Sequence, residues 1–445
     1  MNRRDFLRLC AAGASMPLIG DSVPDSFPAV TLRITTVTVD LAPGRSVRTV
    51  GYNGSSPGTV IRVREGGTVT FDVRNETDST EIVHWHGLHI PSDVDGSIEE
   101  GTPTVEKGES RRYTFQASPA GTRWYHTHMM AGRNLRRGLY TGQFGFLIVE
   151  PRSEAGAYDQ EVLLAMHEWN GFPTAGSEDD DSMDIGYKHY SINDRSLGFG
   201  EPIHVKQGQR ILFRILNASA TLPHRIGLSG HKFKVVALDG NPVPHPTEVE
   251  ALELGPAERI DATVEMNNPG VWILGSTDEV ERKQGLGTVI EYSNRRGEAQ
   301  WRAPSAERWD YTRFGGQRTT EKPATRVPLV FEKKFAGHHW VDKWTINGQS
   351  FPKADPINVR QGQRYRLVFD NRSNEAHPVH LHRHSFELVS VEGHKTVGIQ
   401  KDTVVVRPNA ATEVDLVADN PGPTLFHCHQ QMHMDYGFMK MLEYM

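Results

Sequence analysis

The chain has 445 residues, enough for about three globular domains at the usual size of about 150 residues each. Its 49 Lys and Arg residues against 55 Asp and Glu residues leave a formal net charge of −6, and no apolar run approaches the roughly 18 residues that span a bilayer. These features exclude a peptide or a disulfide-stapled miniprotein and favour neither nucleic-acid binding nor a membrane span. The 42 glycines and 26 prolines indicate many turns and short strands, so we expect an all-β protein.

The N-terminus carries a basic pair followed by a short apolar segment. Arg3 and Arg4 precede an apolar stretch from Leu9 to Gly20, which is too short to cross a membrane. This pattern resembles a twin-arginine export signal, and a disordered basic N-terminus is the alternative. We therefore expect residues 1–25 to be a leader that the twin-arginine export machinery reads, and the mature protein to be periplasmic or secreted.

One spacing of valine, glycine and asparagine occurs three times along the chain. In each copy the glycine follows the valine by three positions and the asparagine follows it by twelve: Val63, Gly66 and Asn75; Val205, Gly208 and Asn217; Val359, Gly362 and Asn371. Apolar residues alternate with period two inside each copy, which is typical of a strand with one buried face. The spacing of the copies predicts three tandem β-sandwich domains at about residues 26–155, 156–300 and 301–445.

Histidines follow the first and third copies in pairs. Each of these copies is followed by two His-x-His pairs, and the four pairs are His84 and His86, His126 and His128, His380 and His382, and His427 and His429. The middle copy has Gly227 and Ser229, and then Gly275-Ser276-Thr277, at the matched positions. Residues i and i+2 of a strand point to the same face, so each pair can direct two imidazoles at one point. We predict a metal site between the first and third domains.

The remaining histidines outside these motifs carry no such pattern. We interpret His167, His189, His204, His245, His338, His339 and His394 as structural or exposed side chains, which is the usual role of a lone histidine in a strand.

Cys428 indicates which metal the site binds. The other cysteine, Cys10, lies in the expected leader, so we expect no structural disulfide. Imidazole also suits zinc, iron and nickel, but Cys428 with His377 and His433 forms the His₂Cys set of a blue-copper electron-transfer centre. Because successive residues in a strand face opposite sides, the thiolate of Cys428 would point away from its two neighbouring histidines. The segment therefore predicts a short covalent link for electrons between two metal sites.

The four motifs together are similar to those of a known family. The chain contains His84-Trp-His86-Gly, Trp124-Tyr-His126-Thr-His128, His377-Pro-Val-His380-Leu-His382 and His427-Cys428-His429-Gln-Gln-Met-His433. Over residues 30–445 it resembles the multicopper oxidases, the laccase family. This resemblance implies three tandem cupredoxin-like Greek-key β-sandwich domains that bind four copper ions.

The resemblance also implies a ligand set for each type of copper. His377, Cys428 and His433 would bind the type 1 copper, and His84 and His380 the type 2 copper. The type 3 pair would be bound by six histidines: His86, His126, His128, His382, His427 and His429.

Two further residues are singled out by their distance from these motifs. Asp95 follows His86 by nine positions, where the resembled family keeps an acid that supplies protons, although Asp95-Gly96 is also a favourable turn dipeptide. Phe438 follows His433 by five positions and is expected at the axial position of the type 1 copper. The adjacent Met439 would take that position if the strand contained a one-residue bulge.

The resemblance implies an enzyme that couples oxidation of a small reducing substrate to the reduction of O₂ to water. We expect phenols or aromatic amines as substrates, since no long methionine-rich insert is present. A metal-ion oxidase acting on Cu(I) or Mn(II) is the alternative within this class. A structural cell-division protein or a copper-sequestering protein of the same fold is the alternative from another class, and a structural relative would be expected to have lost ligands, whereas none is lost here.

Overall fold

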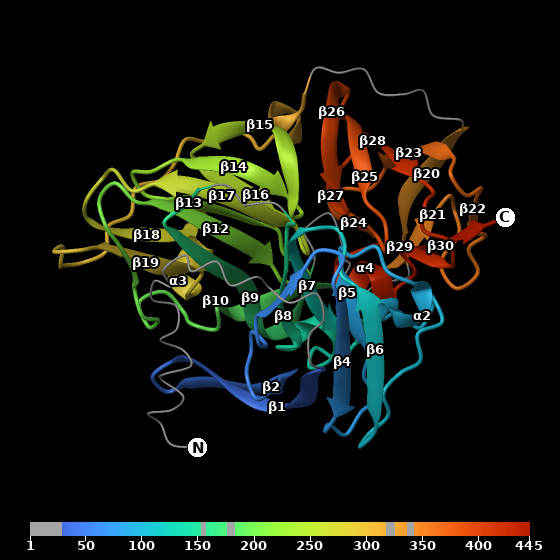
Figure 1. Cartoon of the computed structure of the whole chain (residues 1–445), viewed down its shortest axis with the longest axis horizontal. Helices are drawn as coiled ribbons and strands as arrows, with labels where there is room; N and C mark the ends of the chain where they lie inside the picture. The colour runs from blue at the N-terminus through green and yellow to red at the C-terminus, as the bar shows by residue number, and fades with distance from the viewer. Residues whose placement is uncertain (1–28, 153–156, 176–182, 317–324, 336–341) are drawn as a thin grey trace.

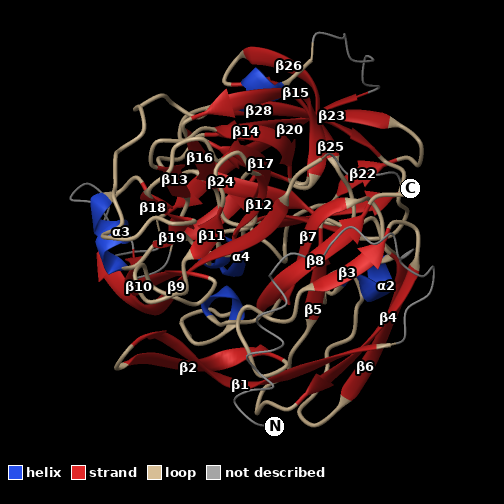
Figure 2. Ribbon diagram, turned by 60° about the vertical axis from the view of Figure 1, so that its left-hand side comes forward, coloured by secondary structure: helices blue, strands red, loops and turns tan. Residues whose placement is uncertain are grey.

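The computed structural model describes residues 29–152, 157–175, 183–316, 325–335 and 342–445, so the predicted leader lies outside the described residues. Within these ranges the strands form six sheets, which follow one another along the chain as three pairs (Figure 1). Helices are short and few beside the strands (Figure 2). The all-β prediction is confirmed, whereas the exact domain boundaries stay a prediction.

The first pair of sheets has the strand orders β2-β1-β4-β6 and β3-β8-β7-β5. Its elements are β1 (Val30–Ala42), β2 (Arg45–Tyr52), β3 (Ile61–Arg64), β4 (Thr68–Asn75), β5 (Val83–His86), α2 (Ser92–Asp95), β6 (Ser110–Gln116), β7 (Gly121–Thr127), η2 (Gly138–Tyr140) and β8 (Phe144–Glu150). Side chains that alternate along the strands, such as Val69, Phe71 and Val73 of β4, are fully buried between the two sheets. Their burial supplies the main stabilisation of this unit.

The second pair has the orders β10-β9-β12-β17-β14-β15 and β11-β19-β18-β13-β16. Its elements are β9 (Gln160–Ala175), β10 (Met183–Ile192), β11 (Ile203–Val205), β12 (Arg210–Asn217), β13 (His224–Leu228), β14 (Phe233–Leu238), β15 (Asn241–Val249), β16 (Ala251–Leu254), β17 (Arg259–Glu265), β18 (Val271–Ser276), α3 (Glu279–Gln284) and β19 (Gly287–Tyr292). This unit lies beside both of the others (Figure 1).

The third pair has the orders β21-β20-β23-β28-β25-β26 and β22-β30-β29-β24-β27. Its elements are β20 (Thr325–Lys334), β21 (Lys343–Ile346), β22 (Ile357–Val359), β23 (Arg364–Asn371), β24 (His377–Leu381), β25 (Phe386–Val391), β26 (His394–Lys401), β27 (Thr403–Val406), β28 (Ala411–Val417), β29 (Thr424–Cys428), α4 (Gln431–Asp435) and β30 (Met439–Tyr444), and η3 (Tyr311–Phe314) precedes them. The strand orders repeat those of the second pair.

The repeated valine, glycine and asparagine have the same structural role in all three units. The valine lies in a short strand that pairs in parallel with the last strand of its unit. The glycines have φ of 74°, 84° and 78°, a conformation that side chains rarely adopt. Each asparagine is buried, and its amide donates one hydrogen bond to a backbone carbonyl of the loop that follows and another to a carbonyl of a more distant segment. The repeat is therefore a folding signature that leads into the strands where the first and third units carry histidines.

Candidate metal centre

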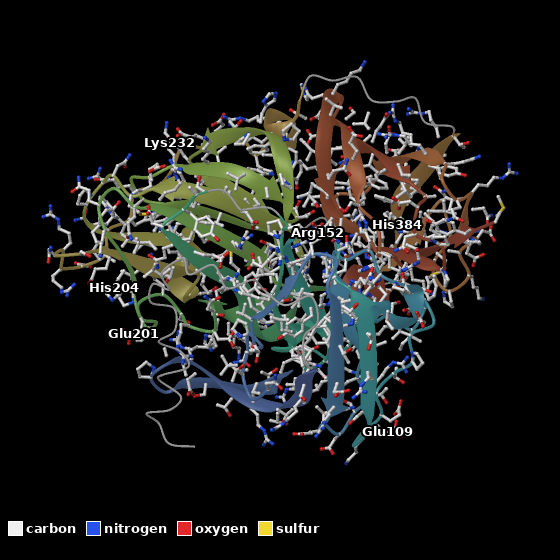
Figure 3. The ribbon with its side chains drawn as sticks, in the orientation of Figure 1. Glu109, Arg152, Glu201, His204, Lys232 and His384 are labelled. Atoms are coloured by element: carbon white, nitrogen blue, oxygen red, sulfur yellow. The ribbon has the colours of Figure 1, made fainter. Side chains whose placement is uncertain are left out.

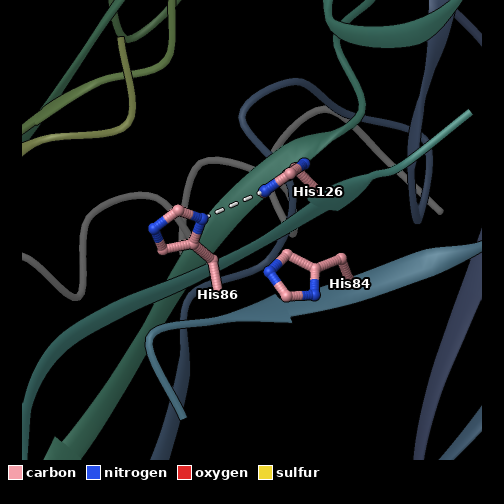
Figure 4. A group of neighbouring side chains, drawn as sticks. All are labelled: His84, His86 and His126. Carbon is pink, nitrogen blue, oxygen red and sulfur yellow. Dashed lines mark hydrogen bonds between the residues drawn. The ribbon is translucent and has the colours of Figure 1, made fainter. Parts of the chain in front are cut away.

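The predicted ligands come from four strands, two in the first unit and two in the third. Strands β5 and β7 pair so that His84 lies opposite His126, and β24 and β29 pair so that His380 lies opposite His427. His86, His377 and Cys428 lie in these strands too, and His128, His382, His429 and His433 follow their ends. Figure 4 shows His84, His86 and His126 around one point. All eleven side chains are at most 6% exposed, so the pairing registers bring the predicted histidines together in the interior.

Most of the ten histidines donate one ring N–H to a protein acceptor, which leaves the other nitrogen free. In four of them, His84, His126, His380 and His427, Nδ1 lies against a backbone carbonyl. Nδ1 of His382 lies against the carboxylate of Asp95. The other three use Nε2: that of His86 contacts Asp402, that of His377 contacts Ser373, and that of His433 contacts Glu375. Such contacts orient a ligating imidazole and select its tautomer.

The free nitrogens turn toward one another in the interior. The Nε2 atoms of His382 and His427 are 3.1 Å apart, and Nδ1 of His86 is 3.4 Å from Nε2 of His126. Burial lowers the pKa of His427 and His126, so these rings are neutral and their lone pairs face each other. Lone pairs at this separation need a shared cation to be stable.

Several ring nitrogens of the predicted ligands have no hydrogen-bond partner in the described residues. They are Nε2 of His84, Nε2 of His380 and both ring nitrogens of His429. A buried polar atom without a partner costs roughly 1–3 kcal/mol. A metal ion bound by these nitrogens would remove that cost, so the residues present fit the expected metal cluster.

A separate group contains the cysteine. The Cys428 sulfur lies 3.5 Å from Nδ1 of His433 and 3.8 Å from Nδ1 of His377, and these two nitrogens are 3.0 Å apart. Burial raises the pKa of the Cys428 thiol above its ordinary value. A metal ion reverses this effect because a coordinated thiol is deprotonated. The site thus has the two imidazole nitrogens and the sulfur that a blue-copper centre requires.

Asp95 lies against the histidine cluster, where its position in the sequence predicted it. One carboxylate oxygen, Oδ2, is 3.0 Å from Nδ1 of His84 and 2.8 Å from Nδ1 of His382. Burial alone would raise the pKa of Asp95, but the two histidines hold it well below its usual range. Gly96 also makes the turn, with φ of 98° and no room for a Cβ beside the carbonyl of Val83. Asp95 therefore both belongs to the Asp-Gly turn and contacts two of the predicted ligands.

Two carboxylates near the ligands were not foreseen in the sequence. Asp402, between β26 and β27, accepts from Nε2 of His86 at 3.1 Å and is itself paired with Arg259. Glu100 accepts from the backbone N–H of Leu425 and lies 3.4 Å from Nδ1 of His382. Both side chains are buried among other polar groups, and burial together with the neighbouring Asp95 raises the pKa of Glu100 well above its ordinary value. For Asp402, the sequence offered one indication: the charged pair Lys401-Asp402 stands directly before the apolar strand β27.

The histidines outside the motifs have other roles where they are described. His204 lies at the surface of the second unit, far from the ligands (Figure 3). His167 is buried and faces the carbonyl of Ala218 through Nδ1, and His384 is bonded to the hydroxyl of Tyr444. His338 and His339 lie outside the described residues. No helix in the described part of the chain is long and apolar enough to cross a membrane.

Comparison with known proteins agrees with this geometry. Models of multicopper oxidase domains match residues 33–154, 168–294 and 324–444. Multicopper oxidase MmcO of Mycobacterium tuberculosis is 32% identical over 98% of this chain and 89% of its own length. A multi-copper oxidase from Pseudomonas thermotolerans is 27% identical with a TM-score of 0.75, covering 94% of this chain and 100% of that chain.

A third similar protein is described by the type of reaction it catalyses. A multicopper oxidase from Campylobacter jejuni, described as a metallo-oxidase, is 23% identical with a TM-score of 0.75, covering 96% of this chain and 93% of that chain. The predicted three-domain, cupredoxin-like fold is confirmed by these likenesses. The chain belongs to the multicopper oxidase family, whose members bind copper and use O₂ as electron acceptor.

Proposed function

We propose that the chain binds four copper ions in two groups. His377, Cys428 and His433 would hold the type 1 copper, and His84 and His380 the type 2 copper. The type 3 pair would be held by two triads of histidines, in which His86 and His126 act with His429, and His128 and His382 act with His427. The facing nitrogens and the unpartnered nitrogens described above support this assignment. When bound, copper supplies one-electron redox chemistry at the first site and the reduction of O₂ to water at the second.

Cys428 carries the connection between the two groups. Its sulfur belongs to one group, and the adjacent His427 and His429 belong to the other. The peptide units on either side of Cys428 therefore provide a covalent path for electrons from its sulfur to His427 and His429. This segment is the single observation that best supports electron transfer to O₂ as the function.

Glu375 supports an entry point for electrons at the surface. Its carboxylate accepts from Nε2 of His433 at 2.9 Å, and its side chain is 33% exposed whereas the His433 side chain is 4% exposed. A reducing substrate at Glu375 would thus be one hydrogen bond from a ligand ring. A carboxylate there can accept a proton from a phenol or an aromatic amine, and it can also bind a metal cation.

We propose phenols or aromatic amines as the physiological class of substrate, with Cu(I) or Mn(II) as the alternative. The metallo-oxidase among the similar structures favours keeping that alternative. The test is kcat/KM of the copper-loaded protein for a methoxyphenol, an aromatic diamine, Cu(I) and Mn(II). A preference for the organic donors supports the proposal, and a preference of at least tenfold for either metal ion overturns it in favour of the alternative.

Replacing Asp95 with asparagine should slow O₂ reduction by about 100-fold and leave reduction of the type 1 site by substrate nearly unchanged. The reason is that Asp95 contacts ligands of the O₂ site only, where protons are consumed. Stopped-flow recordings of the blue absorption separate the two half-reactions. The exposed Asp93 of the same short helix is the control, because Asp93→Asn should change neither rate. Equal reoxidation rates in Asp95→Asn and the wild type would dismiss the role.

Replacing Phe438 with methionine should lower the reduction potential of the type 1 copper. The Phe438 ring lies with its centroid 4.8 Å from that of His377, whereas Met439 packs with Leu425 and Met434 in a separate cluster. A phenyl ring cannot coordinate, and a thioether stabilises Cu(II) relative to Cu(I) when it binds axially. Redox titration of the blue band measures the potential. Met439→Leu should be silent, and a large rise in potential in that variant would identify Met439 as the axial ligand.

Replacing Arg3 and Arg4 together with lysine should leave the precursor in the cytoplasm. We propose that residues 1–25 are a twin-arginine leader and that the mature oxidase, with domains at 26–155, 156–300 and 301–445, works in the periplasm or outside the cell. The export receptor reads the arginine pair as an address, and lysine keeps only the charge. Fractionation with immunodetection measures the distribution, and unchanged export of the double variant would show that the leader is read differently.

A further inference from the structure

The second unit repeats the element order and pairing that hold the type 1 ligands in the third. Strand β18, helix α3 and strand β19 match β29, α4 and β30, each displaced along the chain by about 152 residues. Gly227 of β13 pairs with Gly275 of β18, as His380 of β24 pairs with His427 of β29. The two units can therefore be compared position by position.

At the three type 1 ligand positions the second unit has His224, Ser276 and Glu281. His224 begins β13 as His377 begins β24, and Ser276 ends β18 as Cys428 ends β29. Glu281 follows Ser276 by five positions, and His433 follows Cys428 by the same five. One of the three residues is still a ligand of the original kind, and the other two are oxygen donors.

These three side chains also meet as the type 1 ligands do. Ser276 donates to Oε2 of Glu281 at 2.6 Å, and that oxygen is 3.1 Å from Nδ1 of His224. In the third unit it is again Nδ1 of the matching histidine that faces the centre, 3.0 Å from His433. His224 and Ser276 are each 1% exposed.

The surroundings of the three residues match as well. Nε2 of His224 is bonded to Glu168, which fixes its ring as Ser373 fixes that of His377. Leu286 is fully buried at the position of Phe438, so the axial side is apolar in both units. Tyr190 packs edge-on against the histidine ring in the place that Trp344 has in the third unit.

Charge explains how the site is stable with these residues. Burial would lower the pKa of His224, but Glu168 and Glu281 on either side of the ring raise it to about 10. The His224 imidazolium thus supplies the positive charge that a metal ion would supply at this site, and both of its ring nitrogens have a carboxylate partner. The soft sulfur ligand that selects copper is missing.

We propose that the second unit retains the framework of a second type 1 copper site at His224, Ser276 and Glu281, which Ser276→Cys and Glu281→His would restore to copper binding. The proposal rests on the type 1 assignment of His377, Cys428 and His433. That assignment is tested separately by the loss of blue absorption in Cys428→Ser alone, so the two failures can be distinguished.

The test is made in the full chain with Cys428→Ser and Cys10→Ser, which leaves the introduced thiol as the only one. Adding Ser276→Cys and Glu281→His should return an intense blue thiolate-to-copper absorption of intensity per chain similar to that of the wild type, and bound copper should rise by about one ion per chain. The matched control, Ser276→Ala with Glu281→His, should show no such band. A folded double variant with no band overturns the proposal.

Ser276→Cys by itself keeps the proposal testable if the double variant fails to fold. In the same background, Co²⁺ should then give a thiolate-to-cobalt absorption through His224 and the introduced sulfur. The additional change His224→Gln should reduce the affinity for Co²⁺ by at least tenfold. Absence of the cobalt band in the folded single variant, or a band that is indifferent to His224→Gln, overturns the proposal.

Discussion

Replacing Cys428 with serine should abolish the intense blue absorption and reduce the oxidation of every substrate below detection. The sulfur is the only cysteine sulfur in the described residues and lies within 3.8 Å of a nitrogen of both His377 and His433. Serine has nearly the same shape but does not supply the soft, deprotonated ligand that blue copper needs. Absorption spectroscopy and O₂ uptake measure the two losses.

The same variant should remain folded, because Cys428 forms no disulfide and its side chain is small. Circular dichroism and thermal unfolding should resemble those of the wild type without copper. Thr424→Ser in the same strand is the matched control, since the hydroxyl that accepts from Arg383 is kept and no ligand is touched. Blue colour that persists in Cys428→Ser would refute the assignment of the type 1 site.

Replacing Arg259 with methionine should lower the free energy of unfolding by about 3 to 5 kcal/mol. Arg259 comes from the second unit, donates to Asp402 of the third at 2.7 Å and donates to the carbonyl of Thr122 of the first at 3.2 Å. All of these groups are fully buried. Methionine would leave the Asp402 carboxylate without its main cation and with only the more distant Arg123, at 3.6 Å, so the buried charge would be poorly compensated.

The loss should extend to the metal cluster, because Asp402 also orients His86. Thermal unfolding measures the stability, and copper content after dialysis measures the cluster. Arg112→Met is the control: its pair with Asp72 is at the surface, so both quantities should stay close to the wild type. Adding Asp402→Leu to Arg259→Met should recover part of the stability but not the copper. Equal stability of Arg259→Met and the wild type would exclude the proposed link between the three units.

The sequence predicted those parts of the site that depend on local pattern. Strand periodicity and the threefold repeat predicted the sheets. Matched positions in the repeats identified the eight paired histidines, and the motif around Cys428 identified His377 and His433. The count of five positions from His433 predicted Phe438 at the axial side, where its ring packs beside His377, whereas Met439 packs in another cluster. These features depend on neighbours in the chain or in one sheet.

Contacts between units were not predictable in the same way. Asp402 and Arg259 are 143 positions apart, and Glu100 meets the backbone of Leu425 from 325 positions away. Such pairs depend on how the domains pack, and one sequence without relatives contains no periodicity that specifies this packing. The sequence matched Ser276 with Cys428, but the contacts that join His224, Ser276 and Glu281 became visible only in the structure.

The most direct test of the four-copper oxidase is the ratio of electrons to O₂ in the copper-loaded protein. A one-electron phenolic donor in limiting amount is oxidised in a sealed cell while the O₂ consumed and any hydrogen peroxide formed are recorded. We predict four donor molecules oxidised for each O₂ consumed, without peroxide, because four bound copper ions in connected sites would supply the four electrons that reduce O₂ to water. A ratio of two with one peroxide for each O₂ would contradict the account.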